Sequence, residues 1–231
     1  MNLGQNLQFL RRLRGGMTQE ELAERLDVSR QTVSKWETQQ AYPEMDKLLA
    51  LCDLFSCTLD QLVREDMNIA DAEHYSDVRV ETVEAFRYMR YAVISMEPEE
   101  DAKAHVNAWA RQLGICQPRI IGWDFPVLSQ EQINVYSMHG YAAALVLPEG
   151  MESPAGAEVL SQAAQEYAVI TIRRPFDAPF RLIPGAYQIL LRWLQTNVCA
   201  DSRGAAGIPC FEREYLQDGV ECMDVYMAVK A

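Results

Sequence analysis

Residues 18–53 contain the start signals of two helices that are separated by only two residues. Thr18 is followed three positions later by Glu21, which is the pattern of a capping box at the beginning of a helix. Ser29 gives the next helix a similar start after the connection at residues 27–28. Two helices joined this closely must cross at a steep angle, so the pattern predicts a helix-turn-helix whose second helix lies in DNA.

The second helix of this pair has one apolar and one polar face. Val33 and Trp36, together with Val28 in the connection, are placed to close a small core. The opposite face carries hydrogen-bond donors and amides of the kind that match base edges and phosphates in a major groove. The residues on that face are Arg30, Gln31, Thr32, Ser34 and Lys35.

The run V-S-R-Q-T-V-S-K-W-E, followed by Y-P-E-M-D-K-L-L-A-L-C-D-L-F, resembles the Xre family of phage-repressor-like regulators over residues 3–65. The resemblance implies a compact five-helix domain that binds double-stranded operator DNA through the polar face just described. It also implies that Gln19 binds a phosphate. The chain departs from the family at Gln39, where a glycine or similar turn former is usual. A positive φ there would cost Gln39 about 1 kcal/mol relative to glycine.

Charge and length divide the chain into two halves. A chain of 231 residues is natural for two domains, and its net charge is −12. Residues 1–70 hold 8 basic and 11 acidic side chains, a charge of −3, which leaves −9 for the remainder. A DNA-binding protein this acidic must concentrate its positive charge, and we expect Arg12, near the end of the first helix, to contact phosphates.

The remaining composition excludes several classes of protein. The six cysteines show neither CxxC nor Cys/His spacing, the first residues lack a basic segment leading into an apolar one, and no apolar run approaches the ~20 residues of a membrane span. We therefore expect a cytoplasmic protein with reduced thiols, and without a structural metal, a cofactor or a membrane-spanning segment.

A polar stretch without hydrophobic periodicity at residues 66–77 marks the boundary between the halves. We predict a DNA-binding domain at residues 1–68, a linker at 69–76 and a second domain at 77–231. In the second domain the order strand, strand, helix, strand, strand occurs twice. The strands are predicted at 78–82, 88–96, 120–125 and 141–147, then 157–161, 167–173, 208–216 and 223–229, and the helices at 97–114 and 184–197.

The repeated order indicates an internal duplication, because Y-A-V-I at 91–94 recurs at 167–170. The predicted fold class is α+β: an all-α five-helix DNA-binding domain followed by a duplicated ββαββ domain. Two such units placed side by side would form a curved sheet backed by two helices. The groove between the units is then a natural ligand site.

Residues 77–230 resemble the GyrI-like effector-binding domain. The resemblance depends on Y-A-A-A-L-V-L-P-E-G at 141–150, on P-C-F-E at 209–212 and on M-D-V-Y-M-A-V at 223–229, together with Ala186, Tyr187, Trp193 and Asn197 in the second helix. It implies a pocket lined by aromatic residues, with a buried glutamate that pairs with cationic lipophilic compounds. Glu212 holds that position. The usual tyrosine stands one residue late, at Tyr215, so a bulge or a shifted register would follow, and either Glu212 or Glu214 would face the pocket.

Alternation along the strand supports this assignment independently of the family. In a regular strand Cys210, Glu212 and Glu214 share one face, and a buried unpaired carboxylate selects a cation because the cation relieves its desolvation. An aromatic face adds about 0.5 to 2 kcal/mol per cation contact. The aromatic candidates are Trp123, Tyr141, Tyr187 and Trp193, although Trp193 on its apolar helix face also suits a core, and Glu214 and Asp224 also suit solvated positions.

No motif in the chain indicates catalysis. His74, His105 and His139 are dispersed, and neither G-x-S-x-G nor HExxH occurs. We predict a homodimeric, one-component transcription regulator that is not an enzyme, and that senses a hydrophobic cation in its C-terminal domain. Two alternatives stay open: a C-terminal domain that only mediates assembly, and a drug-sequestering or hydrolytic GyrI-like protein.

Overall fold

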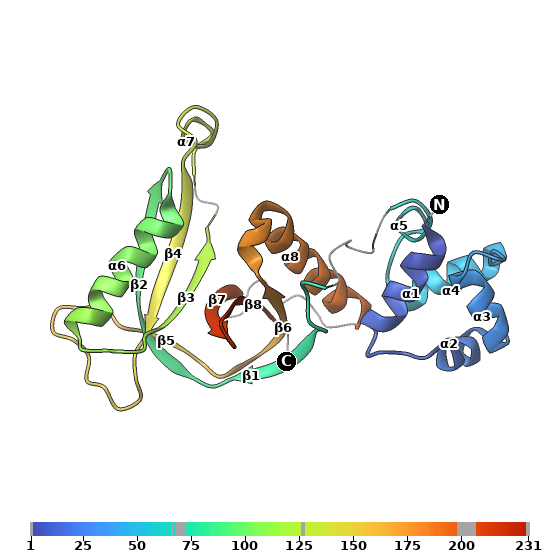
Figure 1. The fold of residues 1–231 in the computed structure, drawn as a ribbon, viewed down its shortest axis with the longest axis horizontal. Helices are drawn as coiled ribbons and strands as arrows, with labels where there is room; N and C mark the ends of the chain where they lie inside the picture. The colour runs from blue at the N-terminus through green and yellow to red at the C-terminus, as the bar shows by residue number, and fades with distance from the viewer. Residues whose placement is uncertain (1, 66, 68–72, 126–127, 198–206, 230–231) are drawn as a thin grey trace.

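The computed structural model describes residues 2–65, 67, 73–125, 128–197 and 207–229. Five helices form one end of the molecule, and a curled antiparallel sheet with two long helices forms the rest (Figure 1). This arrangement confirms the predicted fold class. In the described part of the chain, no helix is both long and apolar enough to cross a membrane.

The N-terminal helices follow from their caps and their apolar faces. The Thr18 side chain accepts a hydrogen bond from the Glu21 N–H and the Glu21 carboxylate accepts one from Thr18, so the predicted capping box is confirmed. Ser29 caps the next helix, as predicted. Val33 and Trp36 are buried in the small core. The five helices are α1 (Leu3–Leu13), α2 (Gln19–Leu26), α3 (Arg30–Glu37), α4 (Met45–Phe55) and α5 (Leu59–Val63).

The turn after α3 adopts the positive φ that was expected to cost Gln39 stability relative to the glycine usual in the family. Gln39 has a φ of 58°, in the left-handed region that favours glycine. Gly4 of α1 lies against the same turn, and a Cβ at Gly4 would lie 2.5 Å from the Glu37 carbonyl oxygen. The end of α3 is therefore held between a strained turn and a close helix contact.

The C-terminal half contains the predicted duplication within a single eight-stranded sheet. Both ββαββ orders are present, with small differences at the ends of elements. The first unit comprises β1 (Arg79–Val83), β2 (Phe86–Ser95), α6 (Pro98–Gln112), β3 (Arg119–Asp124) and β4 (His139–Val146). The second comprises β5 (Leu160–Gln162), β6 (Gln165–Arg173), α8 (Pro179–Thr196), β7 (Cys210–Gln217) and β8 (Val220–Ala228).

The two units exchange their first strands, which the expected side-by-side arrangement did not include. The strand order is β1-β6-β8-β7-β3-β4-β2-β5, so β1 pairs with β6 of the second unit and β5 pairs with β2 of the first. The units also meet between β3 and β7, where Gly122 is opposite Glu212. The exchanged strands join the two units at both edges of the sheet, and the β3–β7 pairing joins them at its centre.

Two helical segments differ from the predictions. The second long helix begins at Pro179, five residues before the predicted start at Pro184. Pro179 occupies the first turn, where a missing N–H costs little, and Pro184 removes only one backbone hydrogen bond inside the helix. A short helix, α7 (Gln130–Asn134), was not predicted, although Ser129 and Gln132 form a capping box.

The C-terminal end of α8 packs directly on the N-terminal helices, as Figure 1 also shows. Leu13 of α1 lies in the same apolar cluster as Leu194 of α8. The buried Thr196 hydroxyl shares its hydrogen between the Arg192 carbonyl oxygen of α8 at 2.8 Å and the Phe55 carbonyl oxygen at 3.3 Å, and the Asn197 amide donates to the Leu13 carbonyl oxygen at 3.4 Å. One helix of the sheet domain therefore contacts α1 and the end of α4 at once.

The predicted linker lies partly outside the described residues, which omit 68–72. Within it, Tyr75 forms an isolated antiparallel bridge with Ile172, and its hydroxyl donates to the Leu182 carbonyl oxygen at 2.8 Å. The domain bounds at 1–68, 69–76 and 77–231 stay a prediction. These contacts attach the last part of the linker to the second domain.

Candidate functional site: a polar helix face and an acidic cavity

The helix α3 presents the predicted polar face at the surface. Arg30, Gln31 and Lys35 are exposed, and Thr32 and Ser34 are partly exposed. The Ser29 and Thr32 hydroxyls are 2.8 Å apart, and the Ser29 hydroxyl also accepts from the Thr32 N–H. Within the described part of the chain, the exposed guanidinium, amide and ammonium groups form no hydrogen bond or ion pair that would compete with a nucleic acid.

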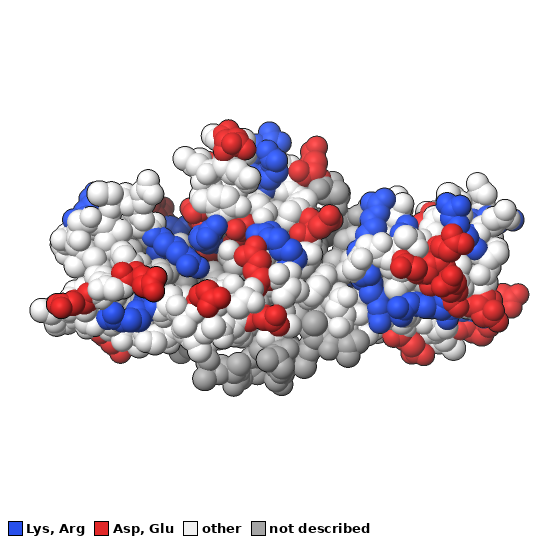
Figure 2. All heavy atoms as spheres, turned by 90° about the horizontal axis from the view of Figure 1, so that it is seen from below, with Lys and Arg blue, Asp and Glu red and all other residues white. Residues whose placement is uncertain are grey.

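Glu37 links this face to α1 and α2. Its carboxylate accepts from the Arg11 guanidinium at 2.7 Å and from the Gln19 amide at 2.8 Å. Gln19 therefore already uses one donor, and a phosphate contact from that donor would require an exchange of hydrogen bonds. Arg12 is exposed. Seen from below, the N-terminal domain carries basic and acidic side chains side by side rather than one basic surface (Figure 2).

A cavity of about 980 Å³ lies between the two units of the sheet domain. The start of α6 and the ends of β3 and β4 contribute one side of it, and Phe176 and Phe180 of the second unit contribute the other. A smaller cavity of about 220 Å³ adjoins it beside β7, and Lys103 and Tyr141 line both. The further lining residues include Glu97, Glu99, Glu100, Asp124, Phe125, Leu128 and His139 in the larger cavity and Asn107, Glu212 and Glu214 in the smaller.

Glu212 is a partly buried carboxylate that accepts one hydrogen bond from the described residues. The Tyr187 hydroxyl of α8 donates to it at 2.9 Å. Burial raises the pKa of Glu212 to about 7, and Glu99 and Asp124 add to this rise, whereas the Tyr187 hydrogen bond and Lys103 oppose it. Among the described residues Glu212 forms no ion pair, so its charge lacks a counter-ion within bonding distance.

Tyr141 extends across β3 at Gly122 and lines the smaller cavity together with Glu212. A Cβ at Gly122 would lie 2.0 Å from the Tyr141 hydroxyl oxygen, so the ring can cross β3 only where the side chain is absent. Gly122 is also the residue opposite Glu212. Burial, followed by the charge of Glu212, raises the pKa of Tyr141 well above its ordinary value. The phenol therefore stays neutral beside the carboxylate.

The bulge expected from the late position of Tyr215 does not occur. β7 pairs with β8 in unbroken register from Cys210 to Gln217. Glu212 and Glu214 consequently share a face and both line the smaller cavity, whereas Tyr215 lies on the opposite face. The two glutamates are not alternatives, because regular alternation places both of them at the site.

Lys103 was not anticipated by the sequence reasoning. Its ammonium forms ion pairs with Glu99, one turn earlier in α6, and with Glu214 of β7. It also lies 5.8 Å from the centre of the Tyr141 ring. The i, i+4 spacing of Glu99 and Lys103 was a visible signal, but such a pair is usually a surface contact. Only the tertiary fold shows that it faces a cavity.

Phe176 and Phe180 were also missed. Phe180 is 97% exposed and Phe176 is 45% exposed, although both line the larger cavity. They belong to the short turn η1 (Pro175–Asp177) and the first turn of α8. Large exposed aromatic rings beside an acidic cavity provide apolar surface for a ligand.

The two predicted tryptophans lie elsewhere. Trp123 packs with Ile121 and Phe86 against the core on the sheet face opposite to Gly122. Trp193 packs against the cluster that contains Leu13 and Leu194. The structure therefore places Glu212, Glu214 and Tyr141 at the smaller cavity with Tyr187 bonded to Glu212, whereas neither tryptophan is among the residues that line the two cavities, and Trp193 shares its apolar cluster with Tyr187.

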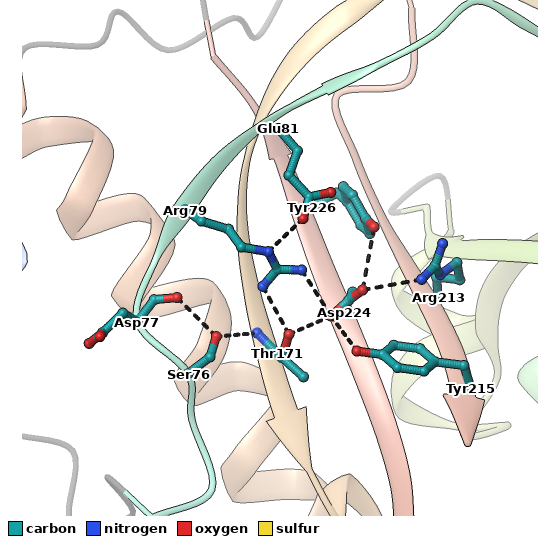
Figure 3. Close-up of polar contacts among 9 residues, drawn as sticks. All are labelled: Ser76, Asp77, Arg79, Glu81, Thr171, Arg213, Tyr215, Asp224 and Tyr226. Atoms are coloured by element: carbon teal, nitrogen blue, oxygen red, sulfur yellow. Dashed lines mark hydrogen bonds and ion pairs between the residues drawn. The ribbon is translucent and has the colours of Figure 1, made fainter. Parts of the chain in front are cut away.

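Asp224, considered suitable for a solvated position, is instead buried, with an exposed fraction of 2%. Figure 3 shows it among the side chains that pair with it. It accepts hydrogen bonds from the Thr171 hydroxyl at 2.6 Å and the Tyr215 hydroxyl at 3.1 Å. Arg79 and Arg213 form ion pairs with it at 3.4 and 3.5 Å. The negative charge of Asp224 is therefore neutralised by two arginines of the same chain. The Glu212 carboxylate, in contrast, receives a hydrogen bond from one phenol.

The described residues contain no group of three or more histidine, cysteine or acidic side chains arranged to hold a metal ion. His139 lines the larger cavity, whereas the His105 ring stacks on Tyr91 at 3.8 Å and His74 lies within 3.0 Å of the Arg173 carbonyl oxygen. The five described cysteines are free thiols.

Comparison with known proteins assigns the N-terminal region. Residues 10–62 match the helix-turn-helix family. The HTH-type transcriptional activator BcrR of Enterococcus faecalis is 40% identical over 81 residues, which are 34% of this chain and 39% of that protein. The chain thus matches about two fifths of the length of this relative.

Two solved structures resemble larger parts of the chain. SAV2435 bound to tetraphenylphosphonium has 14% identity and a TM-score of 0.40, and the alignment covers 68% of this chain and 95% of that one. EcmrR, in a complex with DNA, has 10% identity and a TM-score of 0.46, with 90% and 97% covered. At these TM-scores the similarities carry no functional conclusion. The match at residues 10–62, together with the capped α2 and α3, identifies this region as a helix-turn-helix domain of that family.

Proposed function

We propose that this protein is a one-component transcription regulator that binds operator DNA through α3 and senses a lipophilic cation at Glu212. The single observation that carries the effector part is a partly buried glutamate without a counter-ion, which lines a cavity between two units. The DNA-binding part is supported by the helix-turn-helix match and by the similarity to a transcriptional activator.

The cavity suits an organic cation in both charge and surface. Six carboxylates line its two parts, against one lysine and one histidine. Phe125, Phe176 and Phe180 provide apolar contact for the body of such a ligand, and the Tyr141 ring is already within cation–π distance of an ammonium group. A cation beside Glu212 would relieve the cost of its desolvation, which a neutral analogue cannot do.

The helix α8 provides a physical route between the cavity and the DNA-binding domain. Tyr187 holds Glu212, and Thr196, nine positions further along the same helix, donates to the carbonyl oxygen of Phe55. A ligand that changes the Tyr187–Glu212 contact acts on a helix whose other end touches α1 and α4. Linkage then requires the cation to bind the DNA-competent and DNA-incompetent arrangements with different affinity.

DNA binding in this proposal involves two copies of the chain. Helix-turn-helix regulators read symmetric half-sites about one DNA turn apart, with one recognition helix in each. The homodimer accordingly belongs to the proposal, and its interface lies outside the α3 face.

The proposal is tested by titrating the full chain with tetraphenylphosphonium and with neutral triphenylphosphine oxide, with and without DNA from the gene's own promoter. We expect the cation, but not the neutral compound, to bind in calorimetry and to change the DNA affinity in a mobility-shift assay. The variant Glu212→Gln should lose the cation while binding DNA as before. Absence of specific DNA binding by the wild type would refute the regulator function.

A further inference from the structure

Lys103 lies at the boundary between the two cavities. It projects from α6 and lines both of them, together with Tyr141, and its side chain is 25% exposed. Its ammonium pairs with Glu99 on one side and with Glu214 on the other, below the Tyr141 ring. Two carboxylates and an aromatic face are also the groups that would recognise a positively charged ligand.

The ammonium of Lys103 stays charged in this position. Burial lowers its pKa, but the hydrogen bonds to Glu214 and Glu99 and the negative charges of these residues together outweigh burial, and the net pKa is raised. The Lys103 ammonium thus acts as the counter-ion of Glu99 and Glu214 in the acidic site. Among the described residues, Glu212 keeps the Tyr187 hydroxyl as its hydrogen-bond donor.

We infer that Lys103 is a specificity-determining residue, whose ammonium occupies Glu99 and Glu214 and so restricts the site to ligands with a single positive charge. This inference rests on the proposed function, because it assigns a ligand charge to the same site. A monocation neutralises Glu212. The second charge of a dication would meet the Lys103 ammonium at the entrance to the smaller cavity and would be repelled.

Removing the Lys103 ammonium should change which ligand charges the site accepts. Lys103→Met keeps an unbranched side chain of similar length over Tyr141 and frees two carboxylates. The 220 Å³ cavity, which Glu212 and Glu214 line, then becomes available to a second cationic group. The monocation retains its partner at Glu212 in either case.

The test compares ethidium with propidium, which carry the same ring system with one and two positive charges. Their binding to the full chain without DNA is measured by fluorescence titration at pH 8, where Glu212 is ionised. We expect the wild type to bind ethidium more tightly. In Lys103→Met the propidium affinity should rise about tenfold, the size expected for one close charge contact, while the ethidium affinity changes less than about threefold.

Matched variants separate this effect from a general change in charge. Arg111→Met removes one positive charge from an exposed position of the same helix and should leave the ratio of the two affinities unchanged. Adding Glu214→Gln to Lys103→Met should cancel the gain for propidium. Lys103→Gln provides a second neutral side chain if the methionine variant does not fold.

The outcomes distinguish this inference from the proposed function. If ethidium binds in a Glu212-dependent manner but the ratio is the same in wild type and Lys103→Met, the role of Lys103 is refuted and the cation site remains. If propidium binds the wild type as tightly as ethidium does, the inference is also wrong. If the wild type binds neither dye, the proposed effector site and this inference both fail.

Discussion

Replacing Glu212 by Gln should stabilise the protein at alkaline pH while removing its response to cations. The pKa of Glu212 is about 7 in the folded chain, against an ordinary value of 4.5. Folding therefore favours the protonated form, and ionisation costs stability as the pH rises from about 4.5 through 7. The full cost is reached above pH 7 and amounts to about 3 kcal/mol, at about 1.4 kcal/mol for each unit of pKa.

The glutamine removes this cost and keeps one contact, because its amide oxygen can still accept from the Tyr187 hydroxyl. The stronger hydrogen bond to the ionised acceptor is already included in the folded-state pKa of about 7. We therefore expect Glu212→Gln to raise the free energy of unfolding by about 3 kcal/mol at pH 8 and to change it little at pH 4.5. Urea denaturation followed by tryptophan fluorescence measures both values.

Glu221→Gln is the matched control, because Glu221 is an exposed residue of the neighbouring strand β8 and loses the same charge. It should change stability little at either pH. The same titration predicts that cation affinity rises as the pH increases through about 7, since only the ionised Glu212 attracts a cation. Equal stability changes for Glu212→Gln at both pH values would refute the reasoning, because the carboxylate would then not be strained by its burial.

Four further changes test the DNA-binding domain and its connection to the sheet. Replacing Gln31 by Ala should reduce base discrimination by about 1 to 3 kcal/mol, whereas Arg12→Ala should weaken binding to all sequences alike and lower the salt dependence, both in mobility-shift titrations. Thr196→Val should keep DNA and cation binding but reduce the effect of one on the other, because it removes the donor to Phe55; an unchanged coupling would exclude this contact as the route. Gln39→Gly should stabilise the protein by about 1 kcal/mol in thermal denaturation by relieving the φ of 58°, and a similar gain from Gln40→Gly would contradict that cause.

The N-terminal half was predictable because its determinants are local. Capping residues lie within three positions of the N–H groups that they satisfy, and the two-residue connection between α2 and α3 leaves few geometries. Even the unusual φ at Gln39 followed from a departure in sequence. Strand alternation likewise placed Glu212 and Glu214 on one face of β7, and only the assumption of a bulge, drawn from family spacing, was wrong.

The features that the sequence did not reveal depend on contacts between distant residues. The exchange of β1 and β5 between units involves pairings such as Val83 with Gln165, which no local pattern specifies. Alternation shows that Trp123 and Gly122 lie on opposite faces of β3, but not which face the cavity adjoins. Lys103 was missed for the same reason. Its spacing from Glu99 is that of an ordinary surface pair in a helix, and only the fold shows that Glu214 of β7 lies beside it.

Two carboxylates of the sheet domain show how tertiary contacts decide the role of an acidic residue. Asp224 and Glu212 both lie on strands with apolar neighbours, and sequence alone favours a solvated position for the first and a ligand site for the second. The fold supplies Asp224 with two arginines and several hydroxyl groups, so its charge is satisfied and a ligand has nothing to add. Glu212 receives one phenol and a raised pKa, and its side chain faces a cavity. A site for a cation is therefore recognised by the absence of internal compensation among the described residues rather than by acidity, and in the function proposed above a ligand cation supplies that compensation at Glu212.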